Sequence, residues 1–505
     1  MEKVIRRALV SVYHKEGLAE ILKLLHEQGV EFVSTGGTST FIEGLGYPCV
    51  AVEDLTKYPS MLGGRVKTLH PAIQGGILAR RGHETDQKEV LEYGLSLIDL
   101  VIVDLYPFEA TVASGASEED IIEKIDIGGI SLIRGAAKNF EDVVIIPSQA
   151  DYATLLDILR ERGARTTLEE RRHFARRAFA VSSHYDSAIF RYFDAEDHSA
   201  LRLTADEAKP LRYGENPHQK GVFYGDLDRY FEQLHGKELS YNNLQDVEAA
   251  VSLIQDFSEP TFAILKHNNA CGCASRPTLL EAWTDALAGD PVSAFGGVLV
   301  ANRPIDVATA REIDKLFLEV LIAPDFEAEA LTILEGKKNR ILLRQKEAID
   351  ARWSYRSMLG GVLAQETDRA VETTAEMKPV TKVAPTAEEL TDLVFATKLV
   401  KHSKSNAIVL SKGGQLIASG VGQTSRVDAL KQAIEKARHF GFDLKGAVLA
   451  SDAFFPFDDC VTLAAEAGIT AIAQPGGSVR DADSIAAADR LGIAMVMTGV
   501  RHFKH

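Results

Sequence analysis

The chain is poor in cysteine, carries no excess of positive charge and has no long apolar run. Its 505 residues include only four cysteines, too few and too scattered for a disulfide scaffold, so we expect a reducing compartment. The formal net charge of −16 argues against a nucleic-acid scaffold, because phosphate backbones reward basic surfaces. No stretch has the length of a membrane helix or the pattern of a signal peptide. The sequence therefore predicts a cytoplasmic protein without membrane or nucleic-acid partners.

Metal-ligand spacing is also missing. Cys271 and Cys273 lie near His267, but their spacing is Cys-x-Cys. No Pro-Cys-x-x-Cys follows a His-x-Glu, which is the pattern that zinc deaminases require. We therefore expect no bound metal, and no zinc in particular.

Length and apolar patterning indicate more than one α/β domain. A chain of 505 residues exceeds what one core usually organises. Four apolar runs near the start have the length of a strand: residues 8–12, 30–33, 100–103 and 143–146. Gly29 ends a helix whose apolar residues recur at helical spacing: Leu18, Ile21, Leu22 and Leu25. Alternating strands and helices predict a parallel sheet buried on both faces.

A long helix precedes the expected domain boundary. Residues 166–193 are strongly helical, and the periodicity is lost over residues 194–199. We place the boundary there, between a domain of residues 1–195 and a domain of residues 200–505. The second domain again alternates apolar strands with helices, and no low-complexity tract or short-period repeat is evident.

The first candidate site is Ser34-Thr35-Gly36-Gly37-Thr38, which follows a predicted strand and opens a helix. Glycines allow a close backbone approach, and a helix N-terminus presents free N–H groups to an anion. The segment therefore predicts a phosphate site, although it is neither a Walker loop nor a dinucleotide fingerprint. A plain glycine turn capped by Ser or Thr is the alternative. Ser11 and Lys15, after the preceding strand, are placed to reach the same crevice.

Three further segments, residues 61–71, 104–108 and 126–130, bring reactive groups toward that crevice. They supply, in chain order, Arg65, Lys67, Tyr106 and Asp126. On the helix that follows, Arg134 and Lys138 are four residues apart and share one face. Taken singly, each charge is better explained as a solvated surface group, and only their combination favours a site.

The second candidate site is the pair Lys266-His267, which ends the apolar run 261–265 and precedes Asn268-Asn269. The pair stands where an expected buried strand ends, and α/β proteins place their chemistry at such strand ends. A histidine near its usual pKa is suited to remove a proton at neutral pH. Without its context, the same pair would be ordinary solvated surface.

Several motifs in one order carry a family resemblance. Besides Lys266-His267, they are residues 211–219 (Leu-Arg-Tyr-Gly-Glu-Asn-Pro-His-Gln), 293–297, 451–457 and 501–503. Together with the first candidate site, they resemble the AICAR transformylase/IMP cyclohydrolase family over nearly the whole chain. The resemblance implies a methylglyoxal-synthase-like cyclohydrolase domain, followed by a transformylase region of two cytidine-deaminase-like α/β subdomains without zinc.

The resemblance also implies the roles of the residues. In the first domain it assigns catalysis to Lys67, Tyr106, Asp126 and Lys138. It places Lys15, Ser34, Thr35, Gly36, Gly37 and Thr38 around the substrate phosphate. From their positions in the sequence we expect Ser11, Arg65 and Asn139 to bind substrate there as well. In the second domain it assigns catalysis to Lys266 and His267. It assigns substrate binding there to Arg212, Tyr213, His218, Lys237, Asn406, Phe454, Asp458 and Arg501.

The implied reactions are formyl transfer from 10-formyltetrahydrofolate to the ribotide AICAR, and cyclisation of the formylated product to IMP. The implied assembly is a homodimer that shares its transformylase sites across the interface. Ala270 and His14 depart from residues that are common in the family. Two rival interpretations remain: a first domain that only binds a ribotide phosphate, and a zinc deaminase or RNA-binding module. The missing metal spacing and the acidic charge argue against the second rival.

Overall fold

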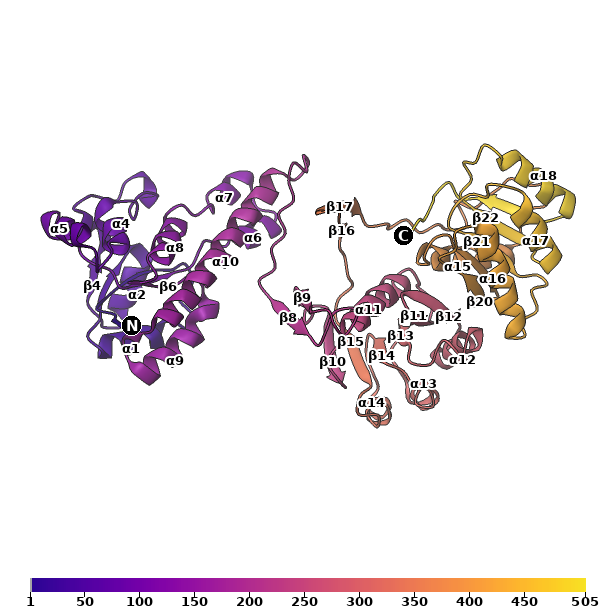
Figure 1. Cartoon of the computed structure of the whole chain (residues 1–505), viewed down its shortest axis with the longest axis horizontal. Helices are drawn as coiled ribbons and strands as arrows, with labels where there is room; N and C mark the ends of the chain where they lie inside the picture. The colour runs from indigo at the N-terminus through magenta and orange to yellow at the C-terminus, as the bar shows by residue number, and fades with distance from the viewer. Residues whose placement is uncertain (1) are drawn as a thin grey trace. The chain divides into compact units, whose positions relative to one another are not determined.

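The computed structural model describes residues 2–505, which form two compact units that divide between Asp206 and Glu207 (Figure 1). The division between the units falls a few residues after residues 194–199, where the sequence loses its helical periodicity. No helix among the described residues is long and apolar enough to cross a membrane.

The first unit is built on a five-stranded sheet in the order β4-β3-β2-β5-β6, with every neighbouring pair parallel. Its strands are β2 (Arg7–Ser11), β3 (Glu31–Ser34), β4 (Cys49–Ala51), β5 (Leu100–Val103) and β6 (Val144–Ile146). All residues of β5 and β6 are buried, as continuous apolar runs require when helices cover both faces of a sheet. The predicted parallel sheet is therefore confirmed. A separate pair, β1 (Lys3–Val4) and β7 (Arg165–Thr166), is antiparallel.

The helices of the first unit follow the predicted pattern. They are α1 (Leu18–Glu27), α2 (Gly36–Gly44), α3 (Val52–Thr56), α4 (Pro71–Leu78), α5 (Glu84–Glu92), α6 (Phe108–Ala113), α7 (Glu118–Ile122), α8 (Gly128–Lys138), α9 (Tyr152–Arg162) and α10 (Leu168–Phe193). The four apolar residues at helical spacing in α1 are all buried. Thr167 caps α10 with a reciprocal bond to Glu170, which fixes where this long helix begins.

The second unit is built on one twelve-stranded sheet in the order β10-β15-β14-β13-β11-β12-β20-β19-β21-β22-β23-β18. The strands of its first half are β10 (Phe231–His235), β11 (Thr261–Lys266), β12 (Asn269–Ser275), β13 (Val298–Ala301), β14 (Val320–Ala323) and β15 (Ile341–Gln345). Those of its second half are β18 (Lys378–Pro379), β19 (Ile408–Lys412), β20 (Gln415–Gly420), β21 (Val448–Ser451), β22 (Ala471–Gln474) and β23 (Ala494–Met497). The hairpins β8 (Ala208–Leu211) with β9 (Gly221–Tyr224), and β16 (Trp353–Met358) with β17 (Gly361–Glu366), stand outside it.

The two halves of this sheet repeat one topology about the central pair β12–β20. The helix α11 (Tyr241–Ile254) precedes the hairpin β11–β12, and α15 (Ala387–Lys401) precedes the hairpin β19–β20. Counterparts differ by 146 in number, as in Asp246 and Asp392 or Lys266 and Lys412. Even the bulge recurs, between Ile264 and Leu265 in one hairpin and between Leu410 and Ser411 in the other. The expected pair of related subdomains is thus visible in the hydrogen bonding, whereas their likeness to cytidine deaminase stays a prediction.

Helices cover both faces of the twelve-stranded sheet. Alternate residues of β11 show this, because Ala263 and Leu265 pack in one core with α11 and α15, whereas Phe262 and Ile264 pack in another. The helices of the second face are α12 (Leu279–Gly289), α13 (Val307–Ile313), α14 (Ala328–Leu334), α16 (Arg426–His439), α17 (Asp459–Ala467) and α18 (Asp481–Leu491).

The C-terminal tail is tied to the second unit by a buried histidine. The ring of His502 lies 2.6 Å from Asp368 and 2.9 Å from Glu372. Burial by itself lowers the pKa of His502, but the bonds to Asp368 and Glu372 outweigh it and raise the pKa to about 9. The backbone N–H of His502 also donates to the carbonyl of Asp452, which follows β21.

This arrangement predicts a pH dependence of stability. Because the folded pKa of His502 is raised, its stabilisation is complete below about pH 6.5 and is lost as pH rises through about 9. We expect the free energy of unfolding to fall by on the order of 2 kcal/mol over that window, measured by urea unfolding. A His502→Gln variant should lack this pH-dependent loss. An unchanged pH profile in the variant would show that the histidine contributes nothing.

Candidate active sites

The segment Ser34–Thr38 lies where the sequence placed it, between β3 and α2, and Thr35 is the N-cap of α2. Two of its hydroxyls hold the loop in place rather than point to a ligand. Ser34 Oγ donates to the carbonyl of Val10 at 2.7 Å, and Thr38 Oγ1 donates to the carbonyl of Val12 at 3.0 Å. The N–H of Thr38 donates to the carbonyl of Thr35, so the N–H groups of Gly36 and Gly37 are left for an anion, beside the hydroxyls of Thr35 and Ser11, which lie 3.3 Å apart.

The three predicted cations near this loop differ in what they contact. A Cβ atom on Gly36 would lie 3.5 Å from Lys67 Nζ, and one on Gly64 would lie 3.7 Å from it, so this ammonium sits over the loop. Lys15 Nζ instead donates to the carbonyls of Val12 and Tyr13, at 2.8 and 2.9 Å. Arg65 is exposed and forms an ion pair with Glu123. Lys67 is therefore the cation closest to the expected phosphate or oxyanion.

Tyr106 and Asp126 form an electrostatic pair at the same edge of the sheet. Burial raises the pKa of Asp126, against the lowering effect of the N–H of Gly129, which donates to it at 2.6 Å. Burial also raises the pKa of Tyr106, and the nearby Asp126 carboxylate adds to that shift. Lys124 lies over the rings of Tyr13 and Tyr106, 5.5 and 5.8 Å from their centroids. A phenol and a carboxyl group at this position are suited to proton transfer.

Lys138 and Asn139 lie at the other end of α8 from Asp126. Lys138 is the last residue of a helix of 11 residues, which rises about 1.5 Å per residue and so spans roughly 15 Å. Asn139 Nδ2 donates to the carbonyls of Ile77 and Ala79, at the C-terminal end of α4. Helical spacing placed Arg134 and Lys138 on one face, but it could not show which groups surround the C-terminal end of α8. The role of Lys138 at the first site stays a prediction.

The Lys266-His267 pair lies at a hairpin turn, not at an open strand end. His267 and Asn268 are the only residues between β11 and β12, with φ of 50° and 65°, which is the left-handed geometry of a tight hairpin turn. The chain turns back at once, because Asn269 opens an antiparallel strand. His267 is exposed at the turn. Lys266 Nζ donates to the carbonyls of Phe295 and Gly296, at 2.7 and 3.0 Å.

Sequence reasoning missed Asp246, a half-buried residue of α11. Its Oδ1 accepts the N–H of Asn268 at 2.6 Å and so holds the turn that presents His267. Burial raises the pKa of Asp246, while the nearby charges of His267 and Lys266 lower it. In the second half, Asp392 accepts the N–H groups of Gly413 and Gly414, at 2.6 and 2.7 Å. A search for residues at the 146-residue offset would have found this carboxylate.

The loop that contains Asn406 lies beside the His267 turn. The N–H of Lys404 donates to Asn269 Oδ1 at 2.9 Å. The amide of Asn406 is fixed on both sides, because its Nδ2 donates to the carbonyl of Gln423 and its Oδ1 accepts from Arg426. The structure therefore brings together two predicted parts of the second site.

The remaining predicted contacts are more widely distributed. Arg212, Tyr213 and His218 lie in the loop between β8 and β9, which touches α11 through Asn242 and Glu215. Lys237 forms an ion pair with Glu319 at 2.6 Å.

The predicted contacts near the C-terminus differ in exposure. Phe454 is exposed, whereas the neighbouring Phe455 is fully buried in the core, so only Phe454 of these two rings can contact a substrate. Asp458 is the N-cap residue of α17. Arg501 is exposed and lies over the ring of Phe503. Among the described residues, no hydrogen bond or ion pair links these side chains to Lys266 or His267.

Metal chemistry finds little support in the residues present. Among residues 2–505, no group of three or more His, Cys, Asp or Glu side chains is arranged to hold a metal ion. Cys271 and Cys273 are buried in the sheet, and burial raises the pKa of the Cys271 thiol to about 12. A thiol held neutral in this way is a poor metal ligand.

Comparison with known proteins gives this arrangement a family. The family model described as AICARFT/IMPCHase bienzyme matches residues 136–436, more than half of the chain. The chain belongs to this family. A second model, the MGS-like domain, matches residues 17–131 and supports the methylglyoxal-synthase-like fold expected of the first unit.

Relatives within the family match over the full length. The chain is 68% identical to the bifunctional purine biosynthesis protein PurH of Bacteroides thetaiotaomicron, over 100% of this chain and 99% of that protein. It is 48% identical to the protein of the same name from Chloroflexus aurantiacus, over 100% of this chain and 99% of that protein. The corresponding protein of Chlorobium luteolum is 47% identical, with 100% of both chains covered.

Proposed function

We propose that this protein catalyses the last two steps of IMP synthesis, formyl transfer from 10-formyltetrahydrofolate to AICAR and cyclisation of the product to IMP. The main support for the proposal is that this chain, a member of the family, contains two separate candidate sites. Lys67, Tyr106 and Asp126 gather at the Ser34–Thr38 loop, and Lys266 and His267 stand at a separate turn. We further propose a homodimer in the cytoplasm, without a nucleic-acid or membrane partner.

Cyclisation needs mainly position and proton transfer. The carboxamide nitrogen attacks a formyl carbon on the same ring, and water is then lost, so holding the reacting atoms together supplies much of the rate. The first helical turn of α2 binds the ribotide phosphate, and Lys67 stabilises the developing oxyanion. Tyr106 and Asp126 move protons to and from the amide and the carbinol oxygen. Burial raises the pKa of both groups above their ordinary values.

Formyl transfer needs a base, because the amine of AICAR is weakened by delocalisation into its ring. His267 removes the amine proton as the new C–N bond forms. The C–N bond between the formyl group and the folate nitrogen then breaks, and this nitrogen takes up a proton from Lys266 or from the protonated His267. Lys266, fixed by two carbonyl oxygens, places a positive charge for the tetrahedral oxyanion. Asn406, held by Gln423 and Arg426, is positioned for the formyl group or the carboxamide.

A coupled assay tests the proposal. The purified chain with AICAR and 10-formyltetrahydrofolate should consume the folate and release IMP in equal amounts. Supplied with the formylated ribotide and no folate, it should still form IMP. If the chain consumes the folate but forms no IMP, it is only a formyltransferase, and the first unit only binds a ribotide.

Asp246 provides a sharper test of the second site. We expect Asp246→Ala to lower kcat for formyl transfer about tenfold or more, because hydrogen bonds to charged groups contribute about 1.5–3 kcal/mol. Asp246→Asn keeps an acceptor for the N–H of Asn268 and should recover part of the rate, with an altered pH profile.

The matched control is Asp392→Ala, which releases the corresponding turn of the other half. It should lower the melting temperature without lowering kcat. Equal losses of kcat in the two alanine variants would mean that Asp246 acts only on stability.

A further inference from the structure

The turn that carries Asp126 is held by one side chain of α10. The hydroxyl of Tyr185 donates to the carbonyl of Lys124 at 2.5 Å and accepts the N–H of Asp126 at 3.0 Å. Burial raises the pKa of Tyr185 to about 12, so the hydroxyl keeps its proton and remains a donor near neutral pH. One hydroxyl therefore supplies the partner for two backbone groups of the same turn.

The ring of Tyr185 also contacts the segment that carries Tyr106. It packs edge to face against Phe108, with 6.2 Å between the ring centroids, in a small buried core of the first unit. The N–H of Phe108 donates to the carbonyl of Tyr106 at 2.8 Å, so these two residues belong to one tight turn. Tyr185 therefore contacts both segments, the one that ends at Asp126 and the one that contains Tyr106.

The distance between Tyr106 and Asp126 affects the protonation of both groups. Burial raises the pKa of Tyr106, and the Asp126 carboxylate raises it further. Burial likewise raises the pKa of Asp126, while the backbone N–H groups of Gly129 and Tyr106 lower it. Because these interactions weaken with distance, a shift of the Asp126 turn would change both pKa values as well as the distance of each group from the substrate.

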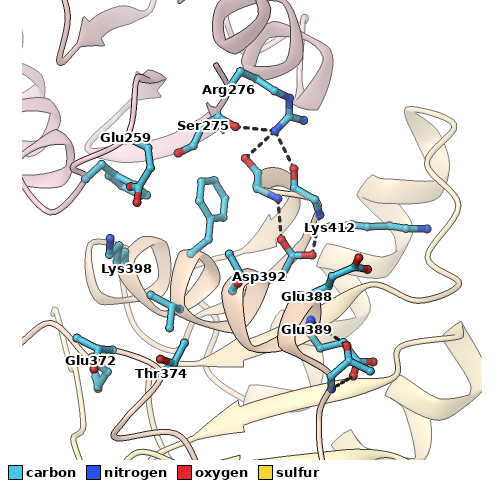
Figure 2. A pocket seen from close by; sticks show the side chains of 18 of the residues that line it. Glu259, Ser275, Arg276, Glu372, Thr374, Glu388, Glu389, Asp392, Lys398 and Lys412 are labelled. Atoms are coloured by element: carbon cyan, nitrogen blue, oxygen red, sulfur yellow. Dashed lines mark hydrogen bonds between the residues drawn. The ribbon is translucent and has the colours of Figure 1, made fainter. Parts of the chain in front are cut away.

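The second unit fixes two of its turns in a similar way, with a helix side chain that bonds to the backbone. Asp246 on α11 holds the turn at His267, and Asp392 on α15 holds the turn Gly413-Gly414. Figure 2 shows the two bonds of Asp392, beside a cavity of about 1150 Å³. In the first unit a phenol takes this place, and it adds no negative charge beside Asp126.

We propose that Tyr185 is a positioning residue for cyclisation, which holds Asp126 against Tyr106 without touching the substrate. The inference rests on the proposed function for the roles of these two groups, and it adds a residue that lies 59 positions from Asp126 in the sequence. Without the hydroxyl, the buried N–H of Asp126 and the carbonyl of Lys124 lose their partner, so the turn moves to find others. A displacement of about 1 Å at a reacting group can cost about 10²-fold in rate.

Tyr185→Phe in the full-length chain tests this role, because it removes the hydroxyl and keeps the ring in its core. We expect kcat for cyclisation of supplied formylated ribotide to fall about 10- to 10²-fold. KM should change little, because the N–H groups of Gly36 and Gly37 lie outside this contact. Formyl transfer should match the parent rate, since its proposed residues belong to the other unit.

Tyr152→Phe is the matched control. Tyr152 is as buried as Tyr185, at 6% and 7% exposed, and it lies in the same unit, on α9. Its buried hydroxyl has no hydrogen-bond partner among residues 2–505. The variant should therefore keep the parent rate of cyclisation and the parent melting temperature. Equal loss of kcat in the two phenylalanine variants would overturn the positioning role.

A double-mutant cycle with Asp126→Asn separates positioning from general stability. If Tyr185 acts through Asp126, adding Tyr185→Phe to Asp126→Asn should lower kcat much less than Tyr185→Phe lowers it in the parent. Fully additive losses would assign Tyr185 a role independent of Asp126 and overturn the inference. Cyclisation at the parent rate in Tyr185→Phe would overturn it as well, whereas no cyclisation in the parent chain would contradict the proposed function itself.

Discussion

Replacing His267 with alanine is expected to lower formyl transfer by about 10²- to 10⁴-fold, which is the usual contribution of a general base. The ring stands exposed at a two-residue turn, so its removal takes no packing from the core. The turn itself is held through the N–H of Asn268 and Asp246, and both remain in the variant. The loss should therefore appear in kcat and leave the melting temperature nearly unchanged.

Cyclisation serves as the internal control for this variant. Because Lys67, Tyr106 and Asp126 belong to the other unit, formation of IMP from supplied formylated ribotide should match the parent rate. His198→Ala is a matched control, because His198 also has a positive φ, at 47°, and lies in the first unit. It should leave formyl transfer intact. Transfer within a few-fold of the parent in His267→Ala would exclude His267 as the base.

Replacing Lys67 with alanine is expected to lower cyclisation by about 10²- to 10³-fold, the usual cost of losing one preorganised charge at an oxyanion. The half-buried ammonium lies over Gly36 and Gly64, beside the first turn of α2. The comparison is between the rate of IMP formation from the formylated ribotide and the rate of formyl transfer. Only the first should fall.

Lys88→Ala, on the exposed face of α5, is the matched control and should change neither rate. Lys67→Arg keeps the charge with a different shape and should recover part of the lost rate. If cyclisation survives in Lys67→Ala while Tyr106→Phe abolishes it, the oxyanion would have to be stabilised without Lys67.

The first unit could be predicted largely from its sequence, because a parallel sheet covered on both faces requires continuous apolar strands. The second unit could be predicted less well. Residues 269–275 include an asparagine, a glycine and two cysteines, which give no clear strand signal, yet they form β12. Their strand state depends on pairing with β11 and β20, and such long-range pairing leaves little trace in local composition.

The candidate sites show the same division between local and distant information. Lys266-His267 stood out because both side chains are unusual beside an apolar run. Asp246 did not, because one carboxylate on an amphipathic helix is ordinary until the turn that it holds is seen. For Lys138, periodicity predicts the face of a helix but not which edge of the sheet that end of the helix reaches.

The left-handed conformation at His267 favours formyl transfer at the expense of thermal stability. A side chain with a Cβ atom in this conformation costs about 1–2 kcal/mol, and glycine avoids that cost. The other half of the sheet has two glycines at the same place. A His267→Gly chain should therefore melt at a higher temperature than the parent while failing at formyl transfer, so selection for robustness alone would erase the base. An imidazole at such a costly position therefore serves the proposed chemistry and not the stability of the fold.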